Sequence, residues 1–150
     1  MSEQDFIDEH RLSMANEDYL ESIYRITVAE NNPSGIRSVD VADQLNVSKA
    51  SVNKAISTLK DAGYVEQNRY GRVTLTQAGR EYGSEVWHAH RLIRAFLEKD
   101  LGVDPEIANE EACTMEHALS RDTMRRWAKF LADQGFSIDQ GEEDGQHKSQ

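Results

Sequence analysis

The sequence predicts a mainly α-helical chain that contains one short two-stranded hairpin. Apolar residues recur at helical spacing through most of the 150 residues. Serine or threonine stands where most of these segments begin, and glycine, asparagine or proline follows where they end. Residues 64–76 instead alternate polar and apolar side chains about a turn at residues 68–71, as a β-hairpin does.

Three helices are expected before the hairpin. The first begins near Ser13 and ends at the loop of residues 31–35, which contains asparagine, proline and glycine. Ser38 is placed to cap a short second helix, and Ser48 is placed to cap a third, which Gly63 ends. The side chains expected along the apolar stripes of these helices are Leu20, Ile23, Tyr24, Thr27, Val39, Val41, Ala42, Leu45, Val52, Ala55, Ile56 and Leu59.

Three more helices are expected after the hairpin. Thr76 can cap a long one that runs to about Leu101, and Pro105 can occupy the first turn of the next, which ends at Leu119. Ser120 can cap the last helix. The residues expected on one face of that last helix are Met124, Trp127, Ala128 and Leu131, with Gly135 as its end.

The order of these elements indicates two domains. Two helices joined by a tight turn and followed by a hairpin are typical of a winged helix-turn-helix, here over residues 13–76 with a two-stranded wing. Residues 77–135 then form a second, helical domain. Residues 1–12 are expected to be a disordered arm and residues 136–150 a disordered polar tail.

The net charge of -10 argues against nucleic acid as a partner, but its distribution argues for it. Residues 48–80 hold six basic and two acidic side chains, net +4, whereas the segments before and after them are each net -7. This basic segment contains the expected recognition helix and wing, so we predict binding to duplex DNA rather than a merely solvated polar face. The residues predicted to contact DNA are Ser38, Ser48, Lys49, Ala50, Ser51, Asn53, Lys54, Arg69, Tyr70 and Arg72.

A second motif carries metal-ligand chemistry. Cys113, Glu116 and His117 stand at i, i+3 and i+4, so they share one face of the predicted helix, beside its apolar stripe. Thiolate, carboxylate and imidazole together suit a divalent transition metal. The alternative is a buried structural cysteine with a surface Glu–His pair.

Three further residues can complete such a site. His90 lies at the edge of the apolar stripe of its helix, where a histidine is more often a core residue than a ligand. Asp18 and Glu21 stand at i, i+3 on the first helix, a spacing that usually means a solvated face. If that face docks on the second domain, a metal can link the two domains.

Other classes of protein are disfavoured. No apolar run approaches a membrane span, and the acidic N-terminus does not resemble a signal peptide, so the protein is expected in the cytoplasm. The single cysteine, Cys113, excludes an intrachain disulfide. A metallohydrolase with Glu116 as general base is a rival, but the sequence has no HExxH motif and the basic wing has no role in it.

These residues together resemble the diphtheria toxin repressor and manganese transport regulator (DtxR/MntR) family of metal-dependent transcriptional repressors. The resemblance runs from about Ser13 to Gly135. The segments that carry it are residues 16–24 (NEDYLESIY), 47–52 (VSKASV), 75–79 (LTQAG), 90–93 (HRLI) and 111–117 (EACTMEH).

The resemblance implies a homodimer whose C-terminal helical domain is the dimerisation domain, and a metal site between the two domains. The positions that match the family's ligands are Asp18, Glu21, His90, Cys113, Glu116 and His117. Asp18 and Glu21 are similar to the manganese-responsive branch, whereas Cys113 is similar to the iron-responsive branch. The residues at positions 94 and 109, Arg94 and Asn109, do not match the ancillary metal site of the iron branch.

The expected function is therefore metal-dependent repression controlling metal-ion homeostasis, in response to Mn²⁺ or Fe²⁺, with Zn²⁺ or Co²⁺ as possible ligands in vitro. Metal binding would order the dimer for binding to double-stranded operator DNA, and no membrane, organic substrate or catalysis is expected. The alternatives are a winged-helix regulator that senses a non-metal ligand and a dimeric DNA-architectural protein that ignores metal.

Overall fold

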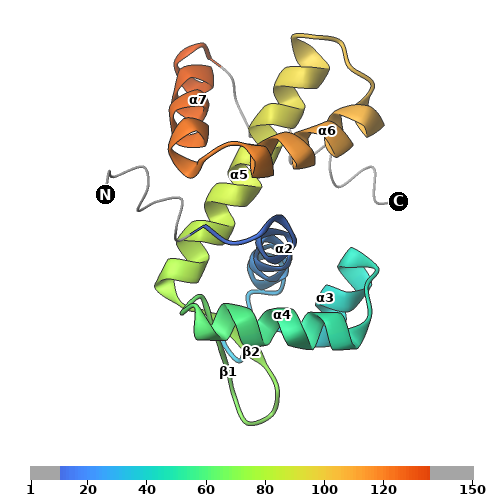
Figure 1. The fold of residues 1–150 in the computed structure, drawn as a ribbon, viewed down its shortest axis with the longest axis vertical. Helices are drawn as coiled ribbons and strands as arrows, with labels where there is room; N and C mark the ends of the chain where they lie inside the picture. Colours follow the sequence, from blue (N-terminus) through green and yellow to red (C-terminus); the bar gives the residue numbers. More distant parts are fainter. Residues whose placement is uncertain (1–10, 136–150) are drawn as a thin grey trace. The chain divides into compact units, whose positions relative to one another are not determined.

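The structure is a computed structural model that describes residues 11–135 (Figure 1). Residues 1–10 and 136–150, which hold most of the expected arm and the whole expected tail, lie outside the described residues. Two compact units divide the described chain after Trp87: residues 12–87 form one, and residues 88–135 with Arg11 form the other. Six helices and one two-stranded antiparallel sheet are described, as predicted.

Three helices precede the hairpin: α2 (Met14–Glu30), α3 (Ser38–Leu45) and α4 (Lys49–Asp61). The predicted caps of α2 and α4 are confirmed, because the hydroxyl oxygens of Ser13 and Ser48 accept hydrogen bonds from backbone N–H groups three residues later. The predicted cap at Ser38 is wrong. Arg37 holds the extended N-cap conformation without a side-chain cap, and its guanidinium pairs with Asp40 at 3.0 Å.

The wing consists of β1 (Val65–Gln67) and β2 (Val73–Leu75), which pair antiparallel with Val65 opposite Leu75. Gly71 closes the turn between them with a φ of 83°, a left-handed conformation that glycine adopts without strain. Ile36, in the loop before α3, forms an isolated bridge with Val73, so the hairpin is anchored to the helical part of this unit.

The core of residues 12–87 is built from the predicted stripes of α2, α3 and α4 together with the wing. Tyr24 and Thr27 of the predicted α2 stripe are only half-buried, and Ile26 is buried in this core. The prediction of Val39 on the buried stripe of α3 is wrong, because Val39 is exposed and only Val41 and Ala42 of that helix are buried. The fully buried apolar residues of this core include Leu20, Ile23, Ile36, Val41, Val52, Ile56, Leu59, Val65 and Val73.

Three helices follow the hairpin: α5 (Gln77–Lys99), α6 (Pro105–Ala118) and α7 (Arg121–Asp133). Their starts are as predicted, since Thr76 and Ser120 cap α5 and α7 and Pro105 begins α6. The buried residues of the second unit's core are Ala89, Ile93, Leu97, Ala108, Ala112 and Met124, and Trp127 packs edge-to-face on Phe96. This core holds α6 against α5 with the predicted ligand face of α6 beside the apolar stripe.

Candidate metal centre and nucleic-acid interface

Three of the predicted metal ligands lie together on α6. Cys113, Glu116 and His117 each offer one ligand atom, and these atoms all lie within 4.8 Å of one another. Their i, i+3, i+4 spacing puts them on one face, as predicted, because the buried Ala108 and Ala112 fix which side of the helix faces the core. Sulfur, oxygen and nitrogen donors at such separations fit a single divalent transition metal.

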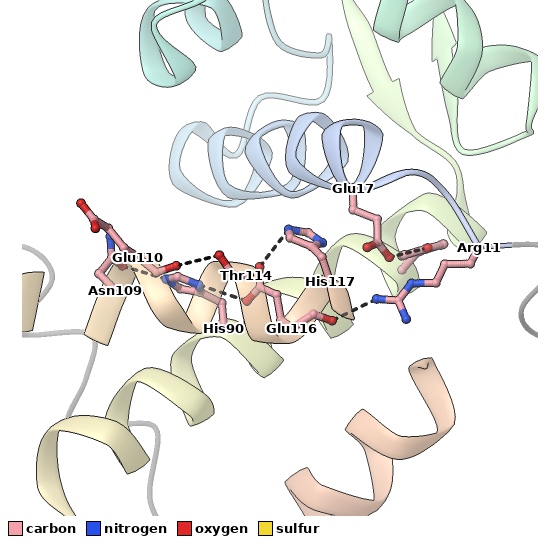
Figure 2. Close-up of polar contacts among 9 residues, drawn as sticks. Arg11, Glu17, His90, Asn109, Glu110, Thr114, Glu116 and His117 are labelled. Carbon is pink, nitrogen blue, oxygen red and sulfur yellow. Dashed lines mark hydrogen bonds and ion pairs between the residues drawn. The ribbon is translucent and has the colours of Figure 1, made fainter. Parts of the chain in front are cut away.

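Glu116 is the centre of this group. Its side chain is 2% exposed, and its two carboxylate oxygens face two imidazoles: Oε2 lies 3.0 Å from His90 Nδ1 and Oε1 lies 3.3 Å from His117 Nε2 (Figure 2). A buried carboxylate is costly unless partner groups offset its charge. The carboxylate therefore lies where a cation would offset its charge, and the two imidazoles beside it are metal-ligand side chains.

His90 enters the site from α5. It is 8% exposed, as expected for a residue at the edge of the apolar stripe, and each of its ring nitrogens lies near a polar group of α6. Nδ1 faces Glu116, and Nε2 lies 2.9 Å from Oδ1 of Asn109 on α6. The structure thus brings four of the six predicted metal ligands together within the second unit, because Glu116 contacts His90 and is itself one of the three ligands on α6.

The other two predicted ligands, Asp18 and Glu21, lie on α2 in the unit of residues 12–87. Both are half-buried, and their i, i+3 spacing places them on one side of the helix. Glu17, directly before Asp18 on the same helix, is buried, and the hydroxyl of Tyr82 donates to its carboxylate over 2.6 Å. This hydrogen bond holds the first turns of α2 against α5.

Arg11 contacts the end of α6, and His88 lies on α5 near His90 in the sequence. The guanidinium of Arg11 donates to the backbone oxygen of Glu116 over 2.9 Å, where the carbonyls near the end of α6 favour a cation. His88 lies two residues before His90 on α5, and partial burial, together with the positive charge of Arg91, lowers the pKa of its imidazole. The imidazole of His88 is therefore held towards its neutral form.

The N-terminus of α4 presents the predicted recognition residues to solvent. Ser48, Lys49, Ala50, Ser51, Asn53 and Lys54 are all exposed, whereas Val52, Ala55, Ile56 and Leu59 are buried on the opposite face. The Ser48 hydroxyl accepts from the backbone N–H of Ser51 and donates to the Ser51 hydroxyl, so it serves first as a helix cap. Small and cationic side chains on an exposed helix start suit close approach to a nucleic-acid groove.

The tip of the wing is ordered by Asn68, whose side-chain oxygen accepts from the backbone N–H groups of Tyr70 and Arg72. Tyr70 is 78% exposed, and the guanidinium of Arg69 lies 5.0 Å from the centre of its ring. Arg72 donates to the backbone oxygen of Gly35, so part of its donor capacity is used within the fold.

At the start of α3, Ser38 is half-buried, and the hydrogen bond and charge of Asp40 raise the pKa of the exposed guanidinium of Arg37. Arg37 therefore remains a cation at any physiological pH.

Sequence reasoning missed the buried pair of Glu17 and Tyr82 and the contact of Asn109 with His90. A charged residue three positions before Leu20 falls on the apolar stripe of α2, and such a position indicates a buried partner. Asn109 stands four residues before Cys113 and so shares its side of α6. The family resemblance marks that position only as a missing ligand.

The fold and the donor set define a winged-helix DNA-binding regulator with a metal-binding helical domain. Residues 11–73 match the family described as "Iron dependent repressor, N-terminal DNA binding domain", and residues 76–142 match "Iron dependent repressor, metal binding and dimerisation domain". The chain belongs to this family of metal-dependent transcriptional repressors, the DtxR/MntR family that the sequence resembles. Its expected class, a DNA-binding transcriptional regulator with a dimerisation domain, is thereby confirmed.

Individual relatives agree with this assignment. An uncharacterized helix-turn-helix-type transcriptional regulator of Methanocaldococcus jannaschii is 37% identical over 120 residues, which cover 80% of this chain and 94% of the relative. The transcriptional regulator MntR of Salmonella typhimurium is 32% identical over 130 residues, which cover 87% of this chain and 80% of that relative.

A solved structure described as a manganese-dependent transcriptional repressor in complex with manganese is 31% identical, with a TM-score of 0.65. The match covers 81% of this chain and 53% of that one, so the chain spans about half the length of that structure. The structure of the manganese regulator SloR gives the same picture, with a TM-score of 0.66 and 28% identity over 81% and 54% of the two chains.

Within residues 11–135, no helix combines the length and the apolar character that crossing a membrane requires.

Proposed function

We propose that this chain is a repressor that binds operator DNA when a divalent metal occupies a site built around Glu116. The observation that carries the proposal is the buried carboxylate of Glu116 between the imidazoles of His90 and His117, on the helix face that also holds Cys113. The family match supports the DNA-binding half of the proposal, and the exposed basic start of α4 supplies a surface for it.

The proposed ligands are the four residues of the second unit and two carboxylates of α2, Asp18 and Glu21. The α2 pair is proposed on its chemistry, its half-buried position and the family resemblance. Carboxylates favour manganese, whereas the Cys113 thiolate favours the softer iron, cobalt or zinc. We propose Mn²⁺ or Fe²⁺ as the physiological ion, and the similarity to a manganese-dependent repressor solved with manganese supports the former.

The proposed switch depends on charge. Asp18 and Glu21 add two carboxylates to that of Glu116, and like charges oppose any arrangement that gathers them without a cation. A bound metal ion would supply positive charge that offsets these carboxylates, and the proposed ligands on α2, α5 and α6 would hold it. The two recognition helices of a dimer must then stand about 34–36 Å apart, the spacing of successive major-groove half-sites.

The test is the affinity for a duplex selected from a random-sequence pool in the presence of Mn²⁺. We expect binding with Mn²⁺ to exceed binding with a chelator by about 5- to 150-fold, the usual range of such coupling. The DNA must tighten Mn²⁺ binding by the same factor, because the coupling is reciprocal. Equal affinity for the duplex with Mn²⁺ and with chelator would refute metal activation.

Variants separate this proposal from a regulator that senses a non-metal ligand. Cys113→Ala combined with His117→Ala should abolish the response to Mn²⁺ while the helical content by circular dichroism stays unchanged. Thr114→Ala, an exposed α6 residue between these ligands, is the matched control and should respond like the original chain. If the double variant still responds to Mn²⁺, Cys113 and His117 are not the ligands that matter.

A further inference from the structure

Asn109 holds the imidazole of His90 from the side opposite Glu116. Its Oδ1 lies 2.9 Å from Nε2 of the ring, whereas Nδ1 lies 3.0 Å from Oε2 of Glu116 (Figure 2). The hydrogen bond with Asn109 therefore holds Nε2, while Nδ1 is directed at the carboxylate of Glu116. The contact with Asn109 joins residues 19 positions apart in the sequence, from α5 to α6.

The folding of α6 does not require asparagine at this position. Asn109 is exposed, so its side chain fills no space in the core. Asparagine is also a weaker helix former than alanine, leucine, glutamate or lysine, because its side chain competes for backbone hydrogen bonds. A residue that is poor for the helix and unnecessary for the core points to a role in its contact with His90.

The chemistry of that contact selects one form of the ring. An amide oxygen has only lone pairs, so Nε2 must carry the hydrogen that it accepts. In a neutral imidazole the lone pair then belongs to Nδ1, the nitrogen that faces the carboxylate of Glu116. Histidines that bind metals usually donate their other N–H to an oxygen in this way, which fixes both the tautomer and the direction of the ring.

We infer that Asn109 is a positioning residue for metal binding, which presents Nδ1 of His90 to the ion beside Glu116. The inference rests on the proposed function, since it assigns a role within the same site. Asn109 itself does not bind the ion, and it acts only through His90. A neutral amide in this position holds the ring without adding a further charge to the site.

The experiment measures Mn²⁺ affinity directly, from the paramagnetic resonance signal of the unbound ion. Asn109→Ala should bind Mn²⁺ about 10- to 100-fold more weakly, the usual effect of removing such a partner of a ligand. Asn109→Asp keeps an oxygen acceptor and should bind at least as tightly as the original chain. Thr114→Ala is the control, since Thr114 is an exposed neutral residue of α6 whose hydroxyl donates to the backbone oxygen of Glu110.

A double variant tests the route of the effect. In a His90→Ala background, Asn109→Ala should cause no further loss of affinity, because residues that act as a unit are not additive. A further 10-fold loss in that background would overturn the inference, as would unchanged affinity of Asn109→Ala. If the original chain binds no Mn²⁺, both the proposed function and the role of Asn109 are refuted. If the original chain and Asn109→Ala bind Mn²⁺ equally well, only the positioning role of Asn109 is refuted.

Discussion

Replacing Tyr82 by phenylalanine should destabilise the protein through one hydroxyl group. Tyr82 is 1% exposed, and its hydroxyl donates to Oε2 of Glu17 over 2.6 Å and accepts from the backbone N–H of Leu12 over 3.0 Å. Its ring packs edge-to-face on Tyr64 at 5.3 Å, a contact that phenylalanine keeps. The substitution therefore removes two hydrogen bonds with little change in packing.

The size of the effect follows from the charge of the acceptor. A hydrogen bond to a charged group contributes about 1.5–3 kcal/mol, and its loss here leaves a 1%-exposed carboxylate with one donor fewer. The Leu12 N–H is a neutral donor of a half-buried residue, so losing its hydrogen bond costs less than losing the one to the carboxylate. We expect Tyr82→Phe to lower the free energy of unfolding by about 2–3 kcal/mol.

The assay is urea unfolding of the metal-free protein, followed by circular dichroism. The midpoint should fall while the denaturant dependence stays the same, since the surface exposed on unfolding is unchanged. Tyr70→Phe is the matched control, because Tyr70 is 78% exposed and its loss of a hydroxyl should change stability by less than about 0.5 kcal/mol. If Tyr82→Phe and Tyr70→Phe unfold at the same urea concentration, Glu17 is not held as described.

The remaining predictions concern a buried glycine of α5 and an exposed lysine of α4, each with a control substitution. Gly79→Ala should cost about 3 kcal/mol or more in thermal or urea unfolding, because a Cβ there would lie 1.9 Å from the backbone oxygen of Tyr64. Gly102→Ala, which meets no atom within 4 Å but has a φ of +69°, should cost only about 1–2 kcal/mol. Lys54→Ala should weaken DNA binding about equally for all sequences and lower the slope of log affinity against log salt by about 1, the effect of one phosphate left without its cation. Lys60→Ala, at the other end of α4, is its control, and an equally weakened affinity there would contradict the assigned docking end of the helix.

The helix boundaries could be predicted because their causes are local. Ser13, Ser48, Thr76 and Ser120 cap their helices through hydrogen bonds that span only three residues. The predicted cap at Ser38 is wrong for a reason that is also local, but the residue types do not reveal it. An extended Arg37 paired with Asp40 can begin the helix without a cap, and the residue types alone favour serine for that role.

The candidate site could be predicted only as far as one helix face reaches. Cys113, Glu116 and His117 share a side of α6 because of their spacing, and no tertiary information is needed. The pairing of His90 with Asn109 depends instead on how far α5 and α6 are shifted along each other, which loop and core packing decide. Helical periodicity tells which face a residue occupies, but it does not name its partner across a packing interface.

Two buried carboxylates show how the choice of partner separates structure from function. Glu17 and Glu116 are 1% and 3% exposed, so neither contributes to the solvated acidic surface that the net charge of -10 suggests. Glu17 accepts a hydrogen bond from a phenol, a group that is not among the usual ligands of divalent transition metals. The partners of Glu116 are imidazoles, whose ring nitrogens bind transition metals. A metal ion can therefore share the partners of Glu116 but not the phenol beside Glu17, and this difference makes the former carboxylate the one suited to a metal-dependent switch.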